Sequence, residues 1–206
     1  MFDQATVAML MEGVVDTLYM TIVSTFFSYV FGIVMAVVLV ICRKDGIRPN
    51  PVVYSVLDVV VNLTRSIPFL ILMIAVIPFT RYVVPLVSAA APFVARLIES
   101  SLLEVDNGVV EAAQSMGAST WQIITKVLLP EALPSLINGS AVAAITILGY
   151  SAMSGAVGGG GLGKLAIMYG YNRYQTDITV ILLIIIVQIF QSFGNWATRH
   201  SDKRGS

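Results

Sequence analysis

Long apolar stretches dominate the chain, and polar residues gather in short segments between them. Residues 17–42 hold no charged side chain over 26 positions, more than the roughly 20 that an α-helix needs to cross a bilayer. The pattern predicts an all-α integral membrane protein with one domain, 1–206, and five transmembrane helices. We place the spans at about 14–42, 53–80, 82–100, 136–156 and 178–198.

The longest polar interruption, at about 104–134, separates the third predicted span from the fourth. It reads as two short helices joined at Gly117-Ala118-Ser119, and Ser119 or Thr120 can cap the second helix. Two prolines, Pro130 and Pro134, then interrupt the helical pattern. An apolar stripe on the second helix is predicted from the i, i+3, i+7 spacing of Trp121, Ile124 and Leu128. The segment is too small for a domain, which leaves two interpretations: an interfacial linker, or a surface against which another protein pushes.

The second predicted span carries polar residues on one face. Asp58, Asn62 and Arg65 follow the spacing i, i+4, i+7, and Pro68 is expected to bend the helix after them. A charged residue that faces lipid at the bilayer centre costs about 2.5–3.5 kcal/mol, so this face is expected to meet protein or water. Either Asp58 forms a structural ion pair with Arg65, or the face lies along a transport path. In the third span, Arg96 and Glu99 are three residues apart and can pair.

The distribution of Lys and Arg between the loops predicts the orientation in the membrane, because cytoplasmic loops are enriched in both. With the N-terminus outside, seven basic residues fall inside: Arg43, Lys44, Arg48, Lys126, Arg199, Lys203 and Arg204. Three fall outside: Arg81, Lys164 and Arg173. We therefore predict an N-out, C-in topology, which places the segment 104–134 in the cytoplasm.

Composition narrows the class of protein. Hydrophobic residues make up 57% of the chain and charged residues 12%, about half the usual charged fraction. The net charge of zero gives no reason to expect a nucleic-acid partner. The single cysteine, Cys42, rules out an internal disulfide, and the absence of a basic segment before Arg43 speaks against a signal peptide.

Signals for catalysis are weak. Residues 158–164, GGGGLGK, fit the first seven positions of a phosphate-binding loop, but the eighth is Leu165, which has no hydroxyl for magnesium. The stretch also follows a predicted membrane helix instead of a strand, so a flexible turn or a close backbone approach explains its glycines better. We find no other catalytic motif and no metal-ligand cluster, and we predict neither enzyme activity nor a bound cofactor.

The segment 104–134 resembles the cytoplasmic signature of ABC-importer permeases. That signature reads E-A-A, three residues, Gly, nine residues, an aliphatic residue, any residue and Leu-Pro. Here it is Glu111-Ala112-Ala113, Gly117, Val127 and Leu129-Pro130, with Val in place of the commoner Ile. The motif is specific for importers that depend on a binding protein, and it says little about the substrate.

Other stretches resemble the permeases of methionine importers, the MetI type. They are RSIPF at 65–69, IPFTR at 77–81, AAPF at 90–93, GYSAM at 149–153 and the glycine-rich run 155–163. The resemblance covers about residues 5–197. One departure is the loop between Arg81 and Ala89, which is about ten residues shorter than is usual in this family and puts the start of the third span in doubt.

The resemblance implies an assembly in the bacterial inner membrane. Two copies of the five-span permease, surrounded by membrane lipid, would form the transport path. Two cytoplasmic ATPase subunits would bind ATP and Mg²⁺, and a substrate-binding protein, often a lipoprotein, would deliver L- or D-methionine. The ABC-importer permease fold is expected for the chain.

The same resemblance suggests two groups of site residues. Contact with the ATPase is expected at a coupling helix, residues 108–119, and in the motif that follows, with seven candidates: Glu111, Ala112, Ala113, Gly117, Ala118, Leu129 and Pro130. The translocation path or gate is expected at five residues: Tyr150, Ser151, Met153, Arg65 and Asn62. Ordinary helix packing is the alternative for the first three of these.

Three alternative functions remain at this stage. The nearest is an ABC-importer permease for another amino acid or a quaternary amine. A secondary transporter or channel is a second class, although five spans with one cytoplasmic insert show no pair of related halves. The third is a membrane scaffold that transports nothing.

Overall fold

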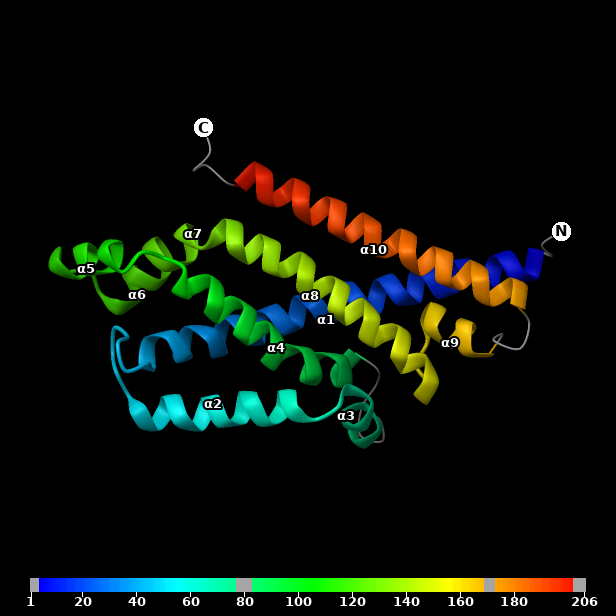
Figure 1. The fold of residues 1–206 in the computed structure, drawn as a ribbon, viewed down its shortest axis with the longest axis horizontal. Coiled ribbons are helices and arrows are strands. Elements are labelled where there is room, and N and C mark those ends of the chain that lie inside the picture. Colours follow the sequence, from blue (N-terminus) through cyan, green and yellow to red (C-terminus); the bar gives the residue numbers. More distant parts are fainter. Residues whose placement is uncertain (1–3, 77–82, 169–172, 202–206) are drawn as a thin grey trace.

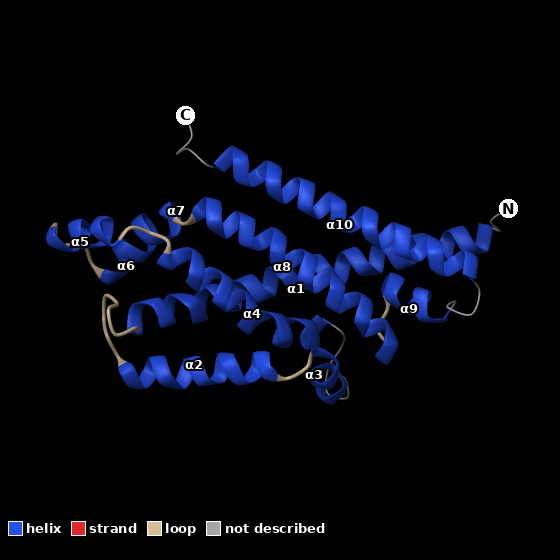
Figure 2. Cartoon of the chain, in the orientation of Figure 1, coloured by secondary structure: helices blue, strands red, loops and turns tan. Residues whose placement is uncertain are grey.

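The computed structural model describes residues 4–76, 83–168 and 173–201, and this part of the chain forms helices joined by short loops (Figures 1 and 2). The longer helices are α1 (Gln4–Cys42), α2 (Pro51–Ser66), α4 (Val83–Leu103), α8 (Leu133–Ser154) and α10 (Arg173–Ser201). The shorter elements are α3 (Phe69–Val76), α5 (Asn107–Ser115), α6 (Thr120–Ile123), the π-helix η2 (Ile124–Leu128), α7 (Leu129–Glu131), the 3-10 turn η3 (Gly155–Val157) and α9 (Gly161–Met168).

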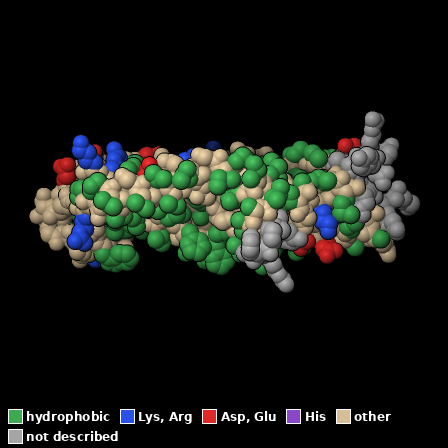
Figure 3. Space-filling model, turned by 90° about the horizontal axis from the view of Figure 1, so that it is seen from below, with side chains coloured by type: hydrophobic (Ala, Val, Ile, Leu, Met, Phe, Trp, Pro, Cys, Tyr) green, Lys and Arg blue, Asp and Glu red, His purple; other side chains and the backbone are tan. Residues whose placement is uncertain are grey.

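Four stretches of helix in the described ranges are long and apolar enough to cross a membrane: Gln4–Cys42, Val83–Leu103, Leu133–Val157 and Asp177–His200. The helices α2 and α3 meet this criterion only as a pair, bent by 97°, and counting that pair as one span gives five. Hydrophobic side chains cover the face shown in Figure 3 along its length, and charged side chains lie mainly toward its two ends. The all-helical membrane class is thus confirmed, while the number of spans and their orientation stay predictions.

The second predicted span is broken at Pro68. Its first helix, α2, ends at Ser66, and Ile67 has the extended conformation (φ −76°, ψ 124°) that a residue before proline favours. Proline also lacks the N–H that would continue the helix. The chain therefore turns sharply into α3 at Pro68, the position where the helix was expected to bend. The rest of that predicted span, and the IPFTR motif at 77–81, lie outside the described residues.

The helix α1 lies along α4 and α8, and α10 packs against α8 (Figure 1). Most of the buried residues of α1 are small or bear a hydroxyl, which lets membrane helices approach closely: Gly13, Thr17, Thr21, Ser24, Ser28, Gly32 and Ala36. By contrast, α2 buries a single residue, Val61, and leaves most of its apolar surface open. An open face of this kind is available to lipid or to another subunit.

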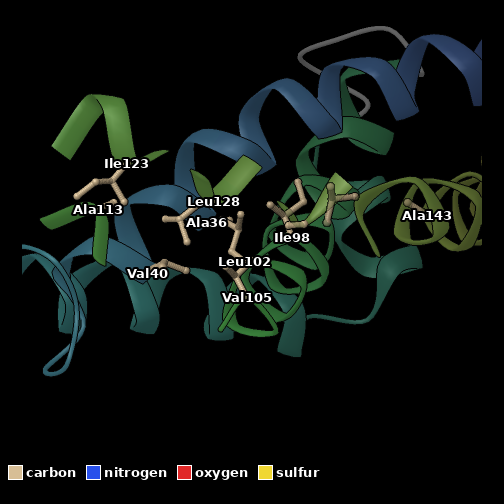
Figure 4. Close-up of a cluster of buried hydrophobic side chains, with 11 residues drawn as sticks. Ala36, Val40, Ile98, Leu102, Val105, Ala113, Ile123, Leu128 and Ala143 are labelled. Atoms are coloured by element: carbon tan, nitrogen blue, oxygen red, sulfur yellow. The ribbon is translucent and has the colours of Figure 1, made fainter. Parts of the chain in front are cut away.

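One apolar core joins the segment 104–134 to the helices of the bundle (Figure 4). The segment contributes Val105, Ala113, Ile123, Leu128 and Ala132. The bundle contributes Ala36 and Val40 of α1, Val94, Ile98 and Leu102 of α4, and Ala143 of α8. The segment is therefore packed onto the bundle and is not a loose linker.

The glycine-rich turn after α8 is packed backbone against backbone. The main-chain N–H of Leu162 donates a hydrogen bond to Thr17 Oγ1 of α1 at 2.8 Å. A Cβ added at Gly163 would overlap the main chain of Ala152, and one at Gly155 would overlap the main chain of Gly163 and Lys164. Close backbone approach accounts for these glycines, in line with one of the two interpretations of the sequence.

We expect Gly163→Ala to destabilise the subunit, because the new methyl group can be accommodated only if α9 moves away from α8. The melting temperature of the purified protein in detergent should fall, and so should the amount inserted in the membrane. Gly149→Ala is the matched control, since no atom lies within 4 Å of its added Cβ. Equal melting temperatures for the two variants would contradict this account of the turn.

Candidate functional site

The first helix of the segment 104–134 has a defined start and a defined end. Asp106 caps α5, and its Oδ1 accepts a hydrogen bond from the N–H of Gly108 at 2.7 Å. After α5, Gly117 takes a left-handed conformation with φ +81°, where glycine has little steric cost. The N–H of the next residue, Ala118, donates to the carbonyl of Ala113 at 3.1 Å, which closes the helix end.

The second helix begins with a capping box at Ser119, one of the two predicted caps. The Ser119 N–H donates to Gln122 Oε1 at 2.8 Å, and the Gln122 N–H donates to Ser119 Oγ at 3.4 Å. Two main-chain donors at the start of α6 are thereby satisfied. The direction of the chain after the Gly117 turn follows from this cap.

The three residues of the predicted apolar stripe on the second helix differ in burial. Ile124 and Leu128 are buried, but Trp121 is 71% exposed and Ile123 takes a buried position in its place. From Ile124 onward the chain forms η2, a π-helical turn in which the N–H of Leu129 donates to the carbonyl of Ile124. Its wider turn changes the angular spacing on which the i, i+3, i+7 pattern depends.

The two prolines of this segment lie where the α-helical pattern is interrupted, as predicted. Pro130 and Pro134 lie in the first turn of α7 and of α8, where a missing N–H has no helical acceptor to lose. Apart from a single turn residue, Ala132, the chain is helical from α6 to the end of α8. The segment thus leads into α8 through a π-helical turn before Pro130 and a single turn residue before Pro134.

The residues of the E-A-A motif point in different directions. Ala113 is 5% exposed and belongs to the shared core, whereas Glu111 and Ala112 are exposed. Gly117 and Pro130 are also exposed, and Ala118 and Leu129 are half-buried. The seven candidates for ATPase contact therefore divide into an outward set and an inward set, and Ala113 is in the inward set.

Exposed apolar residues extend the outward side of α5. Val109, Ala112 and Met116 follow the spacing i, i+3, i+7 and so share one side of the helix; Met116 is 81% exposed. Trp121 adds an exposed ring at the start of the second helix. We call these four residues the coupling surface. Sequence reasoning did not single out Val109 and Met116, and it placed Trp121 in an apolar stripe with Ile124 and Leu128.

Arg65 and Tyr150, two of the five candidates for the transport path, line one cavity of about 160 Å³. Four elements contribute its walls, with Thr64, Arg65, Ile67, Phe69, Ala89, Phe93 and Tyr150. The rings of Phe69 and Tyr150 are stacked, with centroids 4.2 Å apart and planes 8° from parallel. The cavity therefore combines a guanidinium group with aromatic rings.

Asn62 lies apart from this cavity, in a polar network between α2 and α4. Arg96 forms ion pairs with Asp58 of α2 and with Glu99, the latter at 2.6 Å from Nη1 to Oε2. Arg96 Nη2 also donates to Asn62 Oδ1 at 3.0 Å, and Asn62 Nδ2 donates to Asp58 Oδ2 at 3.1 Å. The possible pairing of Asp58 with Arg65 is thus wrong, while the pairing of Arg96 with Glu99 is confirmed. Seven residues of helix separate Asp58 and Arg65 by about 10 Å along the axis, too far for a contact.

The remaining two path candidates are not in this cavity. Ser151 is buried, and its hydroxyl donates back to the carbonyl of Leu148 at 2.8 Å. Met153 is 47% exposed on α8. Within the described ranges, no group of three His, Cys, Asp or Glu side chains is placed to hold a metal ion.

Comparison with known proteins identifies the family. Residues 28–205 match the model of the family described as binding-protein-dependent transport system inner membrane component. The chain is 48% identical to the probable D-methionine transport system permease protein MetI of Vibrio cholerae, over 95% of this chain and 93% of that protein. It is 43% identical to the methionine import system permease protein MetP of Bacillus subtilis, over 98% of each.

A solved structure, described as an inward-facing conformation of the MetNI methionine ABC transporter, contains a chain with the same fold. The TM-score is 0.96 at 42% identity, over 98% of this chain and all of that one. Together with the apolar helices, these findings make the chain a multi-pass inner-membrane protein. The chain belongs to the family of binding-protein-dependent transport system inner membrane components.

Proposed function

We propose that the chain is the permease subunit of an ABC importer that carries methionine across the inner membrane. The observation that carries this proposal is the similarity to methionine permeases over nearly the whole chain, in sequence and in fold. Two copies of the chain form the transport path, and two ATPase subunits bind and hydrolyse ATP with Mg²⁺. A substrate-binding protein, of a kind that is often a lipoprotein, delivers L- or D-methionine from outside.

We also propose five spans with the N-terminus outside, at the predicted positions, and the segment 104–134 in the cytoplasm. The bent pair of α2 and α3 supplies the second span. The beginning of α1 and the end of α10 lie toward opposite ends of the molecule (Figure 1), as an odd number of crossings requires. The basic loop that contains Arg43, Lys44 and Arg48 would then be cytoplasmic.

In the proposed mechanism, the ATPase subunits act on the coupling surface. ATP binding brings the two ATPase subunits together and moves α5, and the shared core carries this movement to α1 and α4, which rocks the bundle between inward- and outward-facing states. Glu111, Ala112, Gly117, Ala118, Leu129 and Pro130 form or support the contact, and Ala113 connects α5 to the core. The path and its gate comprise Arg65, Asn62, Tyr150, Ser151 and Met153.

The transport activity is tested with the complete complex. The permease is purified with its ATPase subunits, reconstituted in liposomes and supplied with the binding protein. We expect uptake of radiolabelled methionine that requires ATP and is absent when the ATPase carries an inactivating substitution. ATP-dependent uptake of a different amino acid, with none of L- or D-methionine, would overturn the substrate assignment.

The coupling surface is tested by Ala112→Arg. The exposed methyl group is replaced by a long charged side chain, so contact with an apolar partner should be lost and methionine uptake should fall by about tenfold or more, a loss of about 1.4 kcal/mol or more. The melting temperature of the permease should not change. Ala113→Arg is the matched variant, because the same side chain placed in the core should lower the melting temperature. Full uptake by Ala112→Arg would exclude this surface as the contact.

A further inference from the structure

We propose that the cavity beside Arg65 is a transient binding site for the transported amino acid, in which the guanidinium group binds the α-carboxylate and the aromatic rings contact the side chain. The proposal rests on methionine import as the proposed function. It adds a site within the permease that recognises the substrate after the binding protein has released it.

The side chain of Arg65 is free to bind an anion. It is exposed in the last turn of α2, and none of the described residues forms an ion pair with it. Asp58, the carboxylate on the same helix, forms its ion pair with Arg96. The hydroxyls of the flanking residues Thr64 and Ser66 donate back to carbonyls of α2 at 2.9 and 2.8 Å.

The position of Arg65 makes a lone charge costly. It lies 14 residues beyond Pro51, about 21 Å along the helix axis, in the pair of helices that is counted as the second span. A cation that faces lipid at the centre of a membrane-spanning helix costs about 2.5–3.5 kcal/mol. This cost is avoided if the side chain faces a water-filled path in which it binds an anionic group. The planar guanidinium group can donate two parallel hydrogen bonds to the two oxygens of a carboxylate.

The remaining walls suit the side chain of methionine. The break at Pro68 brings Phe69 of α3 into the cavity wall only four residues after Arg65, beside Tyr150 of α8 and Phe93 of α4. A thioether makes favourable contacts with aromatic rings. The volume of about 160 Å³ is below the roughly 300–1,000 Å³ of sites for drug-sized ligands, so it suits a small solute.

The test uses a cysteine reporter in the complete reconstituted complex. Cys42 is the only cysteine of the chain, so Cys42→Ser provides a permease without thiols, and Ala89→Cys then places one in the cavity wall. We expect methionine to slow the reaction of this thiol with a neutral methanethiosulfonate reagent several-fold. Methioninamide, which lacks the carboxylate, should not slow it.

Arg65 is tested in the same background. Arg65→Gln should remove the protection by methionine and lower methionine uptake by at least about tenfold, as the loss of a charge-assisted hydrogen bond implies. Arg65→Lys should keep part of both, which separates the loss of charge from misfolding. The control is Arg48→Gln, which removes an exposed cation outside the cavity and should keep protection and uptake.

The possible outcomes distinguish the site from the function. Methionine uptake without protection of the reporter would overturn the site and leave the proposed function intact, whereas no methionine uptake by the unaltered complex would overturn the function itself. Protection that persists in Arg65→Gln would exclude the guanidinium group as the ligand. Protection that depends on anionic phospholipid in the liposomes, and not on methionine, would identify a lipid phosphate as the occupant and overturn the proposal.

Discussion

Gly117→Pro is expected to abolish ATP-dependent methionine uptake while the permease still inserts into the membrane. The ring of proline holds φ near −65°, whereas Gly117 has φ +81°. Proline also lacks the N–H that Gly117 donates to the carbonyl of Gln114 at 2.9 Å. Both effects change the direction in which the chain leaves α5, so the coupling surface should lose its shape. Uptake in reconstituted liposomes and the amount of permease in the membrane are the two measurements.

Two further substitutions at position 117 test whether the left-handed backbone conformation is what transport requires. Asparagine tolerates the left-handed conformation better than other residues with a side chain, and no atom lies within 4 Å of the added Cβ. Gly117→Asn should therefore transport close to the normal rate, and Gly117→Ala should fall between the two because its methyl group costs about 1–2 kcal/mol in this conformation. Normal transport by Gly117→Pro would show that the turn has no role in coupling.

The second large effect is expected from Arg96→Leu. This substitution leaves the carboxylates of Asp58 and Glu99 without their cation, and loss of one partner from a buried ion pair costs about 3–5 kcal/mol. Because the Arg96 side chain is 20% exposed, we expect a value near the lower limit, about 3 kcal/mol. The melting temperature of the purified permease should fall clearly, and Arg199→Leu, which changes an exposed arginine at the end of α10, should have little effect.

A rescue experiment separates charge from packing. If the damage in Arg96→Leu comes from uncompensated carboxylates, adding Asp58→Asn and Glu99→Gln should restore part of the lost stability. A triple variant that is no more stable than Arg96→Leu would show instead that Arg96 acts through its packing between α2 and α4.

Features that depend on neighbours in the sequence could be predicted well. The helical membrane class follows from uncharged stretches, the cap at Ser119 from its hydroxyl, and the break in the second span from Pro68. Arg96 and Glu99 lie about one turn apart on the same helix, so their ion pair could also be predicted from their spacing in the sequence.

Features that depend on residues distant in the sequence could not be predicted. Asp58 is paired across helices with Arg96, and no spacing within α2 indicates that partner. Trp121 is exposed while Ile123 and Ile124 are buried, and the spacing of these apolar residues does not indicate which of them packs onto the bundle. Likewise, two adjacent alanines of one motif face opposite ways, Ala112 outward and Ala113 inward, because the face of α5 that becomes buried is decided by its packing on the core.

The core shared by α5, α1 and α4 also determines how far a displacement of α5 is transmitted through the subunit. Close-packed protein interiors are nearly incompressible, so a displacement of Ala113 reaches Ala36 and Ile98 with little loss of amplitude. Bending is left to the places where packing is thin, such as α2, with its one buried residue. The subunit is therefore stiff between α5 and the bundle and more compliant at α2, and on the proposed path through Arg65 and Asn62 this concentrates the movement beside the substrate.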